Sequence, residues 1–419
     1  MRITLLTVGT MGDVRPFVAL GLGLKRAGHT VVLTTGTNFE RFITGHGLHF
    51  APMQADFLAL VQSDEGKELL RGSPLAAFKA LRTTMPPLVR QILDDSWAAA
   101  QGADCLIFHP KVITGWDMAD SLGIPAFEAV YLPMIVPTRR FPFPLLPART
   151  LGGSLNRLSY ALNPLMTLPL RGTVDRWRKD RLKPQTRPRP GKGSGEGASR
   201  PVLHCFSPSV ITPPDDWPET VHTTGFWFLE EPEYTPPPEL VAFLESGPPP
   251  VYVGFGSMAS QQPEEVTRRV VEAIRTSGNR GLLATGWGGV GPVEASDDLF
   301  CVDSAPHDWL FPRMAAVVHH GGAGTTAAGL RFGKPTVICP FAVDQPYWGR
   351  VVAGLGVGPE AVPQRRLTPD RLARAIGQAT RDDAMRRRAE RLGERIRAED
   401  GVAQAVEVIE TTLDRSKNG

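Results

Sequence analysis

"RITLLTVGTMGDVRPFVALGLGLKRAGHTVVLTT", residues 2–35, carries the pattern that decides the fold. Residues 2–8 form a mainly apolar run, residues 9–13 a turn punctuated by glycine, and residues 14–28 a helical pattern that ends at Gly28. A second apolar run follows at residues 29–35. A strand, a helix and a strand in this order predict a βαβ unit, whose two strands are parallel.

The same alternation recurs along the chain. "ADCLIFH" (103–109) and "GIPAFEAV" (123–130) read as further strands, and a second series opens with "VYVGFGS" (251–257) before a helical stretch at 263–278. We therefore expect an α/β protein with two doubly wound, Rossmann-like lobes that face one another across a cleft. The turns at the strand ends of both lobes would point into that cleft.

Composition shifts predict the domain boundaries. We place the first lobe at residues 1–214, a proline-rich linker at 215–237, the second lobe at 238–397 and a closing C-terminal helix at 398–419. Between residues 141 and 200 the pattern breaks into proline, arginine and glycine, which predicts a loop with a mobile part at about 183–200.

Charge and cysteine content exclude several classes of protein. The 46 basic and 43 acidic side chains nearly balance, and no basic run is interleaved with aromatic residues, which argues against nucleic acid binding. Four scattered cysteines at 105, 205, 301 and 339 predict buried thiols in a reducing compartment. Because no apolar run is long enough for a secretory signal or a membrane span, we expect a cytoplasmic protein.

A second glycine-rich turn indicates an anion site. "AAVVHH" (315–320) reads as a strand, "GGAGTT" (321–326) as a turn and "TAAGLRFG" (326–333) as a helix that Gly333 ends. A turn of small residues before a helix leaves several backbone N–H groups unpaired, and this suits a diphosphate. Tight packing alone would also explain the glycines. The turn at 9–13 lacks the GxGxxG spacing, and the chain has no P-loop motif.

Asp13 in the first turn has two readings from the residues alone. A carboxylate at the end of the first strand could act as a general base in the cleft. Asp is equally a favoured N-cap of the helix that follows.

Longer motifs carry a family resemblance. "HHGGAGTTAAGLRFGKPTVICPFAVDQPYWG" (319–349) resembles the donor-binding signature of GT-B glycosyltransferases that use nucleotide sugars, and residues 7–33 resemble their acceptor-side motif. Residues 215–230 and 305–320 are most similar to the sterol 3-beta-glucosyltransferase branch and its bacterial relatives. Glycosyltransferases of glycopeptide and macrolide antibiotics are next. The resemblance weakens at 57–97 and 141–200.

The resemblance implies how a nucleotide sugar would be held. It assigns the diphosphate to His320 and the turn at 322–325, the sugar hydroxyls to Asp344 and Gln345, and the base to residues 304–308. The donor-side residues expected in full are Thr10, Gly12, Gly256, Ser257, Ser304, Ala305, His307, His320, Gly322, Ala323, Gly324, Thr325, Asp344 and Gln345. Ala328 replaces the ribose-binding glutamate of plant relatives, so the choice between UDP and dTDP stays open.

The activity implied is inverting transfer of a hexose, glucose from UDP-glucose, to a lipophilic alcohol such as a sterol or polyketide. Asp13 would be the general base, and neither a metal ion nor a bound cofactor is expected. Apolar, proline-rich stretches at 127–137, 141–147 and 162–170 predict loops around an apolar acceptor cleft, with His109, Met134 and Phe141 on the acceptor side. Arg139, Arg140, Arg149 and Arg157 predict peripheral membrane contact.

Three alternatives remain at this stage. One is an antibiotic glycosyltransferase that uses a dTDP-sugar, and another is an epimerase or hydrolase of the same fold. The third is a catalytically silent auxiliary protein. The sequence leaves the particular acceptor and the oligomeric state open.

Overall fold

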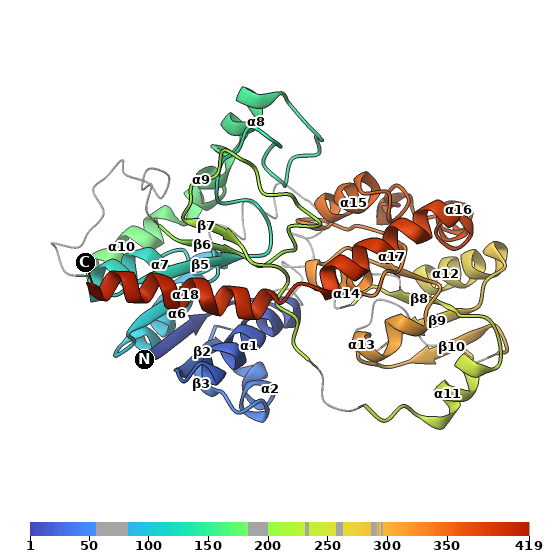
Figure 1. Ribbon diagram of the computed structural model, residues 1–419, viewed down its shortest axis with the longest axis horizontal. Coiled ribbons are helices and arrows are strands. Elements are labelled where there is room, and N and C mark those ends of the chain that lie inside the picture. Colours follow the sequence, from blue (N-terminus) through green and yellow to red (C-terminus); the bar gives the residue numbers. More distant parts are fainter. Residues whose placement is uncertain are drawn as a thin grey trace.

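Two parallel β-sheets, each the centre of one lobe, organise the chain (Figure 1). The computed structural model describes residues 1–55, 83–182, 200–230, 234–256, 263–285, 291, 293–294 and 296–418. The expected α/β architecture with two doubly wound lobes is confirmed.

In the first lobe the described strands pair in the order β3-β2-β1-β4-β5-β6-β7, and all pairs are parallel. Their bounds are β1 (Arg2–Leu6), β2 (Thr30–Gly36), β3 (His49–Met53), β4 (Cys105–Phe108), β5 (Ala126–Val130), β6 (Val202–His204) and β7 (Val221–Thr223). Side chains of β1 alternate between two apolar cores: Leu5 belongs to one and Leu6 to the other. Both faces of this sheet are therefore buried, as the continuous apolar runs predict.

Helices cover both faces of the first sheet. The helical elements here are α1 (Met11–Arg26), η1 (Thr37–Phe39), α2 (Glu40–Gly45), α6 (Met85–Ala100), α7 (Gly115–Leu122), α8 (Gly153–Ser159), α9 (Leu162–Thr167), η2 (Leu168–Leu170) and α10 (Arg171–Arg181). The core on one side takes apolar residues from α1, and the core on the other takes them from α6, α7 and α10.

Two predictions about irregular segments are wrong. The loop expected at 141–200 contains α8, α9, η2 and α10, whose periodicity is interrupted by Pro164 and Pro169. The linker expected at 215–237 contains β7, which pairs with β6 and is too short, at three residues, to show an alternating pattern. The mobile stretch predicted at about 183–200 lies, apart from Arg200, outside the described residues.

In the second lobe the described strands pair in parallel in the order β10-β9-β8-β11-β12. Its strands are β8 (Val251–Gly254), β9 (Gly281–Ala284), β10 (Leu299–Val302), β11 (Ala316–His319) and β12 (Thr336–Ile338). Its helices are α11 (Pro238–Glu245), α12 (Pro263–Ser277), α13 (His307–Leu310), η4 (Phe311–Arg313), α14 (Ala323–Arg331), α15 (Gln345–Gly354), η5 (Gln364–Arg366), α16 (Pro369–Arg381) and α17 (Asp383–Arg397).

An apolar core joins the lobes. Val130 and Phe206 of the first lobe belong to the same buried cluster as Trp348 on α15. The Arg350 guanidinium also donates to the carbonyl oxygens of Pro144 and Leu146, each at 2.8 Å. These contacts hold α15 beside the segment that follows β5.

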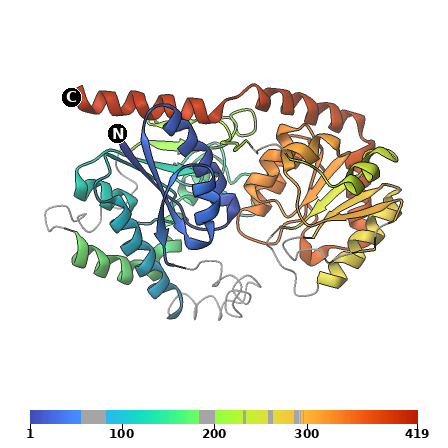
Figure 2. The ribbon, with the colours of Figure 1, turned by 90° about the horizontal axis from the view of Figure 1, so that it is seen from below.

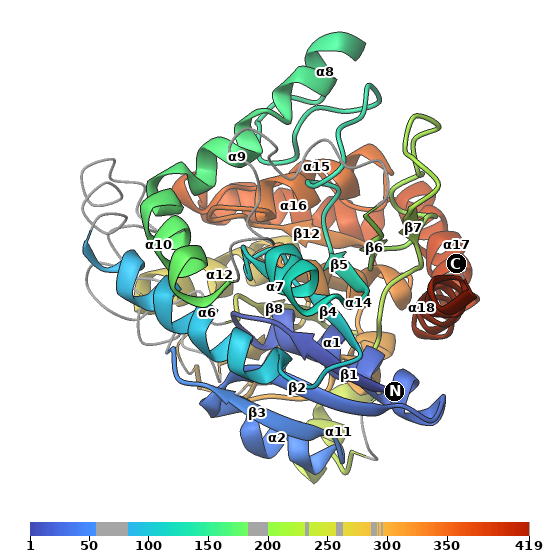
Figure 3. The same cartoon turned by 90° about the vertical axis from the view of Figure 1, so that its left-hand side faces the viewer.

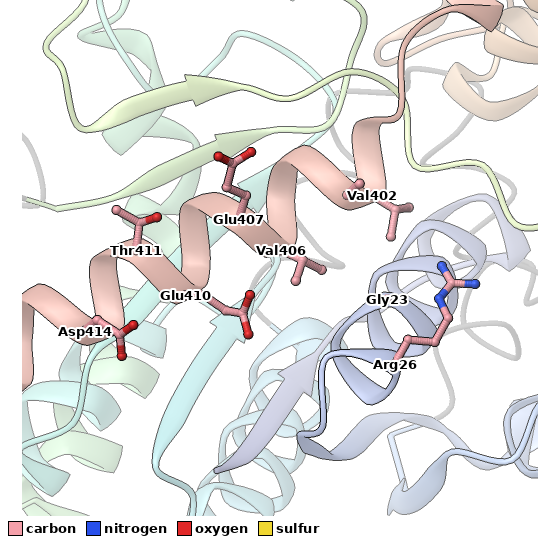
Figure 4. Close-up of a pocket in the computed structure, with 9 residues that line it drawn as sticks. Gly23, Arg26, Val402, Val406, Glu407, Glu410, Thr411 and Asp414 are labelled. Carbon is pink, nitrogen blue, oxygen red and sulfur yellow. The ribbon is translucent and has the colours of Figure 1, made fainter.

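The last helix, α18 (Gly401–Asn418), leaves the second lobe and packs on α1 of the first. Figure 2 shows α17 and α18 running along one side of both lobes. Gly23 permits this approach, because a Cβ there would lie 2.5 Å from Cγ1 of Val402. A surface pocket of about 370 Å³ opens beside this contact, lined by Arg26, Glu410 and neighbouring residues (Figure 4).

That pocket is remote from the turn that carries Asp13. Gly23 lies ten residues further along α1, which corresponds to about 15 Å along a helix axis. It plays no part in the site described below. Among the described residues, we find no helix with the length and apolar character needed to cross a bilayer.

Candidate active site

The turn after β1 presents the carboxylate of Asp13. Thr10 is the N-cap of α1 and Asp13 is its third residue, so the reading of Asp13 as the N-cap is wrong. Asp13 completes a capping box, in which the Thr10 N–H donates to its Oδ2 at 2.8 Å. Gly9 has φ +142°, and a Cβ there would collide with the carboxylate.

The other oxygen of Asp13 is held by two residues from neighbouring strand ends. Lys111, after β4, donates from Nζ to Oδ1 at 2.7 Å, and the Tyr131 hydroxyl, directly after β5, donates to the same oxygen. Burial raises the pKa of Asp13, but the positive charge of Lys111 and the His109 ring lower it more, to about 2. With 6% of its surface exposed, Asp13 is a buried carboxylate that stays ionised at neutral pH.

His109 contacts both residues that hold Oδ1 of Asp13. Its ring stacks on Tyr131 with centroids 5.1 Å apart, and its Nδ1 accepts from the Lys111 N–H at 3.2 Å. The proton of the neutral ring is therefore on Nε2. Burial, followed by the charge of Lys111, lowers the pKa of His109 to about 3, so this ring is neutral at physiological pH. His109 thus contacts both Tyr131 and Lys111, and its contact with an acceptor stays a prediction.

The other expected acceptor-side residues lie on the segment that follows Tyr131. Met134 and Phe141 are partly buried and pack against the core shared by the lobes. Phe141 also meets Trp217 edge to face, with ring centroids 6.2 Å apart. Their contact with an acceptor stays a prediction.

In the second lobe the predicted anion turn is the first turn of a helix. Helix α14 starts at Ala323, with Gly322 as its N-cap, three residues earlier than expected. Ala323, Gly324 and Thr325 are thus its first residues, and their N–H groups are among those without an acceptor inside the helix. The partial positive charge at this end favours an anion.

His320 lies over this helix end. Gly322 and Gly256 leave room for its ring: a Cβ on Gly322 would lie 2.6 Å from Nε2, and one on Gly256 would lie 3.1 Å from Cε1. Burial lowers the pKa of His320 to about 4, and its Nδ1 has no hydrogen-bond partner among the described residues. A neutral ring with a buried nitrogen beside a helix N-terminus is suited to donate to a phosphate oxygen.

Asp344 and Gln345 begin α15 next to that turn. Burial raises the pKa of Asp344 to about 6, and the negative charge of Asp13 acts in the same direction. The Gln345 Oε1 accepts from the Phe341 N–H at 2.7 Å, which leaves the side-chain NH₂ as the group for a ligand. The coupling of Asp13 to Asp344 shows that the two lobes bring their site residues together.

The segment expected to bind the base is partly buried. His307 stacks on Phe311 with centroids 4.3 Å apart, and its pKa is lowered to about 4 by burial and then by the charges of Arg15 and His320. Ser304 is exposed and Ala305 packs on an apolar cluster. Of the remaining donor-side predictions, Gly12 is exposed on α1, and Ser257 lies outside the described residues.

Sequence reasoning missed Lys111, Tyr131 and Arg15. Tyr131 follows β5 directly and Lys111 is the third residue after β4, and the carboxyl ends of parallel strands meet at one edge of a sheet. A polar residue just past each strand was therefore the available signal. Arg15, the fifth residue of α1, brings positive charge close to His307 of the opposite lobe. Within the described part of the chain, no group of three or more His, Cys, Asp or Glu side chains is arranged to hold a metal ion.

Fold and site together define a class of protein. The chain has two doubly wound lobes. A buried carboxylate lies at the strand ends of the first lobe, and a helix N-terminus suited to an anion lies at the strand ends of the second. This is the arrangement of a GT-B glycosyltransferase. Residues 3–103 match the glycosyltransferase family 28 N-terminal domain. Residues 293–411 match the C-terminal domain of erythromycin biosynthesis protein CIII-like proteins. The chain belongs to the GT-B glycosyltransferases of the family 1/28 type.

Curated relatives agree with the expected branch. The chain is 38% identical over 427 residues to a sterol 3-beta-glucosyltransferase of Arabidopsis thaliana, covering 100% of this chain and 66% of the relative. It is 36% identical over 446 residues to a sterol 3-beta-glucosyltransferase of Cryptococcus neoformans, covering 100% of this chain and 27% of the relative. The chain thus spans slightly less than two thirds of the plant protein and about a quarter of the fungal one.

Solved structures agree on the fold. A kitacinnamycin glycotransferase has a TM-score of 0.71 at 19% identity, with 98% of this chain and 99% of that chain covered. A calicheamicin glycosyltransferase has a TM-score of 0.70 at 19% identity, with 99% and 98% covered. The expected GT-B fold and the resemblance to both groups of glycosyltransferases are confirmed.

Proposed function

We propose that this protein transfers a hexose, glucose from UDP-glucose, to a hydroxyl of a lipophilic acceptor such as a sterol or a polycyclic natural product. The names of the curated relatives support the sugar and the acceptor class. The observation that carries the proposal is the ionised, buried carboxylate of Asp13, oriented by Lys111 and Tyr131 at the strand ends that adjoin the second lobe.

Asp13 is the general base in this proposal. It accepts the proton of the acceptor hydroxyl while the hydroxyl oxygen forms a bond to the anomeric carbon. The bond from that carbon to the diphosphate breaks on the opposite face, and the diphosphate leaves with the electron pair. A single displacement inverts the anomeric centre, so an α-linked donor gives a β-glucoside. General-base assistance typically contributes about 10² to 10⁴ in rate.

The leaving diphosphate would be stabilised without a metal ion or a bound cofactor. The first N–H groups of α14 and the neutral His320 ring are suited to the developing negative charge. Arg15 adds a positive charge from the first lobe. Turnover should therefore persist in EDTA, and a loss of turnover that Mg²⁺ restores would contradict metal independence.

The lipophilic acceptor class and the free thiols both bear on where the protein is located in the cell. We propose a cytoplasmic protein in peripheral contact with a membrane, where lipophilic alcohols dissolve. Cys105, Cys205 and Cys339 are buried free thiols and Cys301 is a partly buried one, as a reducing compartment favours. The exposed arginines at 139, 140, 149 and 157 fit an anionic membrane surface.

The test is UDP release from UDP-glucose by the purified protein, with and without a panel of sterols and polyketide alcohols. Mass spectrometry of the products then shows whether an acceptor gained a hexose. Release that depends on an acceptor supports the transferase, whereas release with no acceptor points to a hydrolase. Turnover only with dTDP-sugars would favour an antibiotic glycosyltransferase that uses a dTDP-sugar. No turnover with any donor would favour an auxiliary protein.

A further inference from the structure

A face of exposed apolar side chains lies on α8, α9 and η2. Five of its leucines are spaced by four and three residues in turn, which is the spacing of one face of a helix. We call this set the leucine face: Leu151, Leu155, Leu158, Leu162, Leu165, Met166 and Leu168. Each member is between 37% and 66% exposed. A pattern that normally faces a core here faces outward.

Polar contacts on the inner side fix this orientation. Asn156 is 1% exposed, its Oδ1 accepts from the Leu151 N–H at 2.8 Å and its Nδ2 donates to the Arg139 carbonyl oxygen at 2.9 Å. Tyr160 is 4% exposed and donates to the Pro133 carbonyl oxygen at 3.1 Å. Turning the leucines inward would leave these buried polar groups unpaired, which is costly. The outward leucines are therefore a specified feature of the fold.

The leucine face also projects from the body of the protein. In Figures 1 and 3, seen from two directions at right angles, α8 extends beyond the first sheet at the top of the molecule. The face lies on the segment that leads on from Tyr131, whose hydroxyl contacts the proposed base.

The charged side chains in the segment that carries this face are all positive. Between Ala129 and Val174 the chain has five arginines and no Asp, Glu or Lys. All five are exposed: Arg139, Arg140, Arg149, Arg157 and Arg171.

Acidic residues from outside that segment meet three of these arginines. Glu360 lies 2.5 Å from Arg149, Asp216 lies 3.9 Å from Arg157, and Asp175 lies 3.6 Å from Arg171. These are surface pairs, which are weak and exchange readily for other anions.

We propose that the leucine face and its five arginines dock the protein on an anionic lipid bilayer, with the leucines in the interface and the arginines on the headgroups. This inference deepens the proposed function, because it places the entry of a bilayer-dissolved acceptor on the side of Tyr131 and Asp13. Peripheral proteins are held on membranes by two interactions: burial of apolar side chains at the membrane–water interface, and attraction of cationic side chains to anionic headgroups.

A second copy of this chain fits the same face less well. A symmetric contact would bring two sets of five arginines together, and like charges repel. The helices are also short: α8 ends at Ser159, α9 spans six residues, and Pro164 lies within α9. A coiled-coil seam needs longer, uninterrupted helices.

The experiment is flotation of the purified full chain with phosphatidylcholine vesicles, with and without phosphatidylserine. The apolar variant carries Leu155→Gln, Leu158→Gln and Leu165→Gln. The charge variant carries Arg140→Gln and Arg171→Gln, and its matched control carries Arg387→Gln and Arg391→Gln, two exposed arginines of α17.

We expect the wild type to bind the anionic vesicles. The apolar variant should bind at least about tenfold more weakly than the wild type. The charge variant should bind about 25-fold more weakly, at about fivefold for each of its two arginines. The control should bind as the wild type does. Equal binding by the apolar variant, or equal loss by the control, would overturn the proposal. So would a wild-type dimer that the apolar variant dissociates, seen by analytical ultracentrifugation.

Activity separates this inference from the proposed function. With an acceptor dispersed in detergent, the apolar variant should turn over as fast as the wild type, because the altered leucines lie outside the site. Loss of that activity would contradict a docking role. The protein could bind vesicles through the leucine face and yet show no transferase activity. That result would support the docking surface and refute only the proposed function.

Discussion

At the scale of single residues, the state of Asp13 governs the proposed chemistry. Both of its oxygens are engaged, Oδ1 by Lys111 and Tyr131 and Oδ2 by the Thr10 N–H. This network fixes the carboxylate and keeps it ionised, but a pKa of about 2 makes it a weak base. An acceptor hydroxyl must therefore replace one of these donors, and Lys111 is the more exposed at 37%.

Asp13→Asn should remove the base and keep the shape of the turn. We expect kcat to fall by about 10² to 10⁴, the range of general-base catalysis. UDP affinity, measured by calorimetry, should stay within about twofold because our proposal gives Asp13 no contact with the nucleotide. Turnover at the wild-type rate would remove Asp13 from the mechanism.

Lys111→Met should make Asp13 more basic. Without the ammonium the burial of the carboxyl dominates, so the pKa of Asp13 rises, by about one to three units. The acid limb of kcat/KM for the acceptor, measured at saturating UDP-glucose, should then move to higher pH. Tyr131→Phe, which removes a neutral donor, serves as the comparison and should move the limb less. An unchanged limb in Lys111→Met would mean that Lys111 does not control this carboxylate.

At the scale of elements, the N-terminus of α14 carries the proposed contact with the diphosphate. The helix begins at Ala323, so three residues that the sequence pattern placed in a turn supply N–H groups at the positive end of a helix. The His320 ring can lie there only because Gly322 and Gly256 carry no side chain. Helix, turn and ring together make up the anion site that we propose.

Gly322→Ala should displace His320, since the added Cβ would lie 2.6 Å from its Nε2. UDP affinity, measured by calorimetry, should fall about tenfold to a hundredfold because a hydrogen bond to a charged phosphate is lost. Gly354→Ala at the end of α15 has nothing within 4 Å of its Cβ and is the matched control. If both variants bind UDP like the wild type, His320 has no role in phosphate contact.

At the scale of the whole molecule, the two lobes influence one another through charge. Asp344 on α15 has a pKa raised to about 6 by burial, and Asp13 in the other lobe contributes to that shift. Asp344 therefore changes from mainly protonated to mainly ionised as the pH rises through about 6. The ionised form is the stronger acceptor for sugar hydroxyls.

UDP-glucose binding should accordingly strengthen from pH 5 to pH 7.5, by about fivefold to tenfold. Asp344→Asn cannot ionise, so its affinity for UDP-glucose should change less over the same range. Calorimetry that gives parallel pH profiles of UDP-glucose binding for Asp344→Asn and the wild type would contradict a sugar contact at Asp344.

Helix α18 ties the end of the chain back to the first lobe. Gly23→Ala would place a Cβ 2.5 Å from Val402, which overpacks the contact between α1 and α18. We expect a loss of about 1–3 kcal/mol in the free energy of unfolding, measured by denaturant titration. Gly45→Ala on α2, whose Cβ would meet nothing within 4 Å, should be neutral or slightly stabilising. Equal stabilities would show that α18 accommodates the methyl group.

The sequence by itself determined the two parallel lobes, because apolar strands that end in glycine turns and alternate with helices have few other ways to bury both faces of a sheet. It also contained the resemblance of residues 319–349 to a donor-binding signature, because those residues are neighbours along the chain. The helical elements between residues 153 and 170 escaped prediction because their leucines face outward and prolines interrupt them.

Only the tertiary structure decided what surrounds Asp13. Lys111 and Tyr131 lie 98 and 118 residues away along the chain, and they reach one oxygen because β1, β4 and β5 are adjacent in the sheet. The same holds for the charge coupling between Asp13 and Asp344, which depends on how the lobes pack. A local pattern specifies which residues end a strand; strand order and lobe packing determine which of those ends meet, and hence the charge and hydrogen bonding of the site.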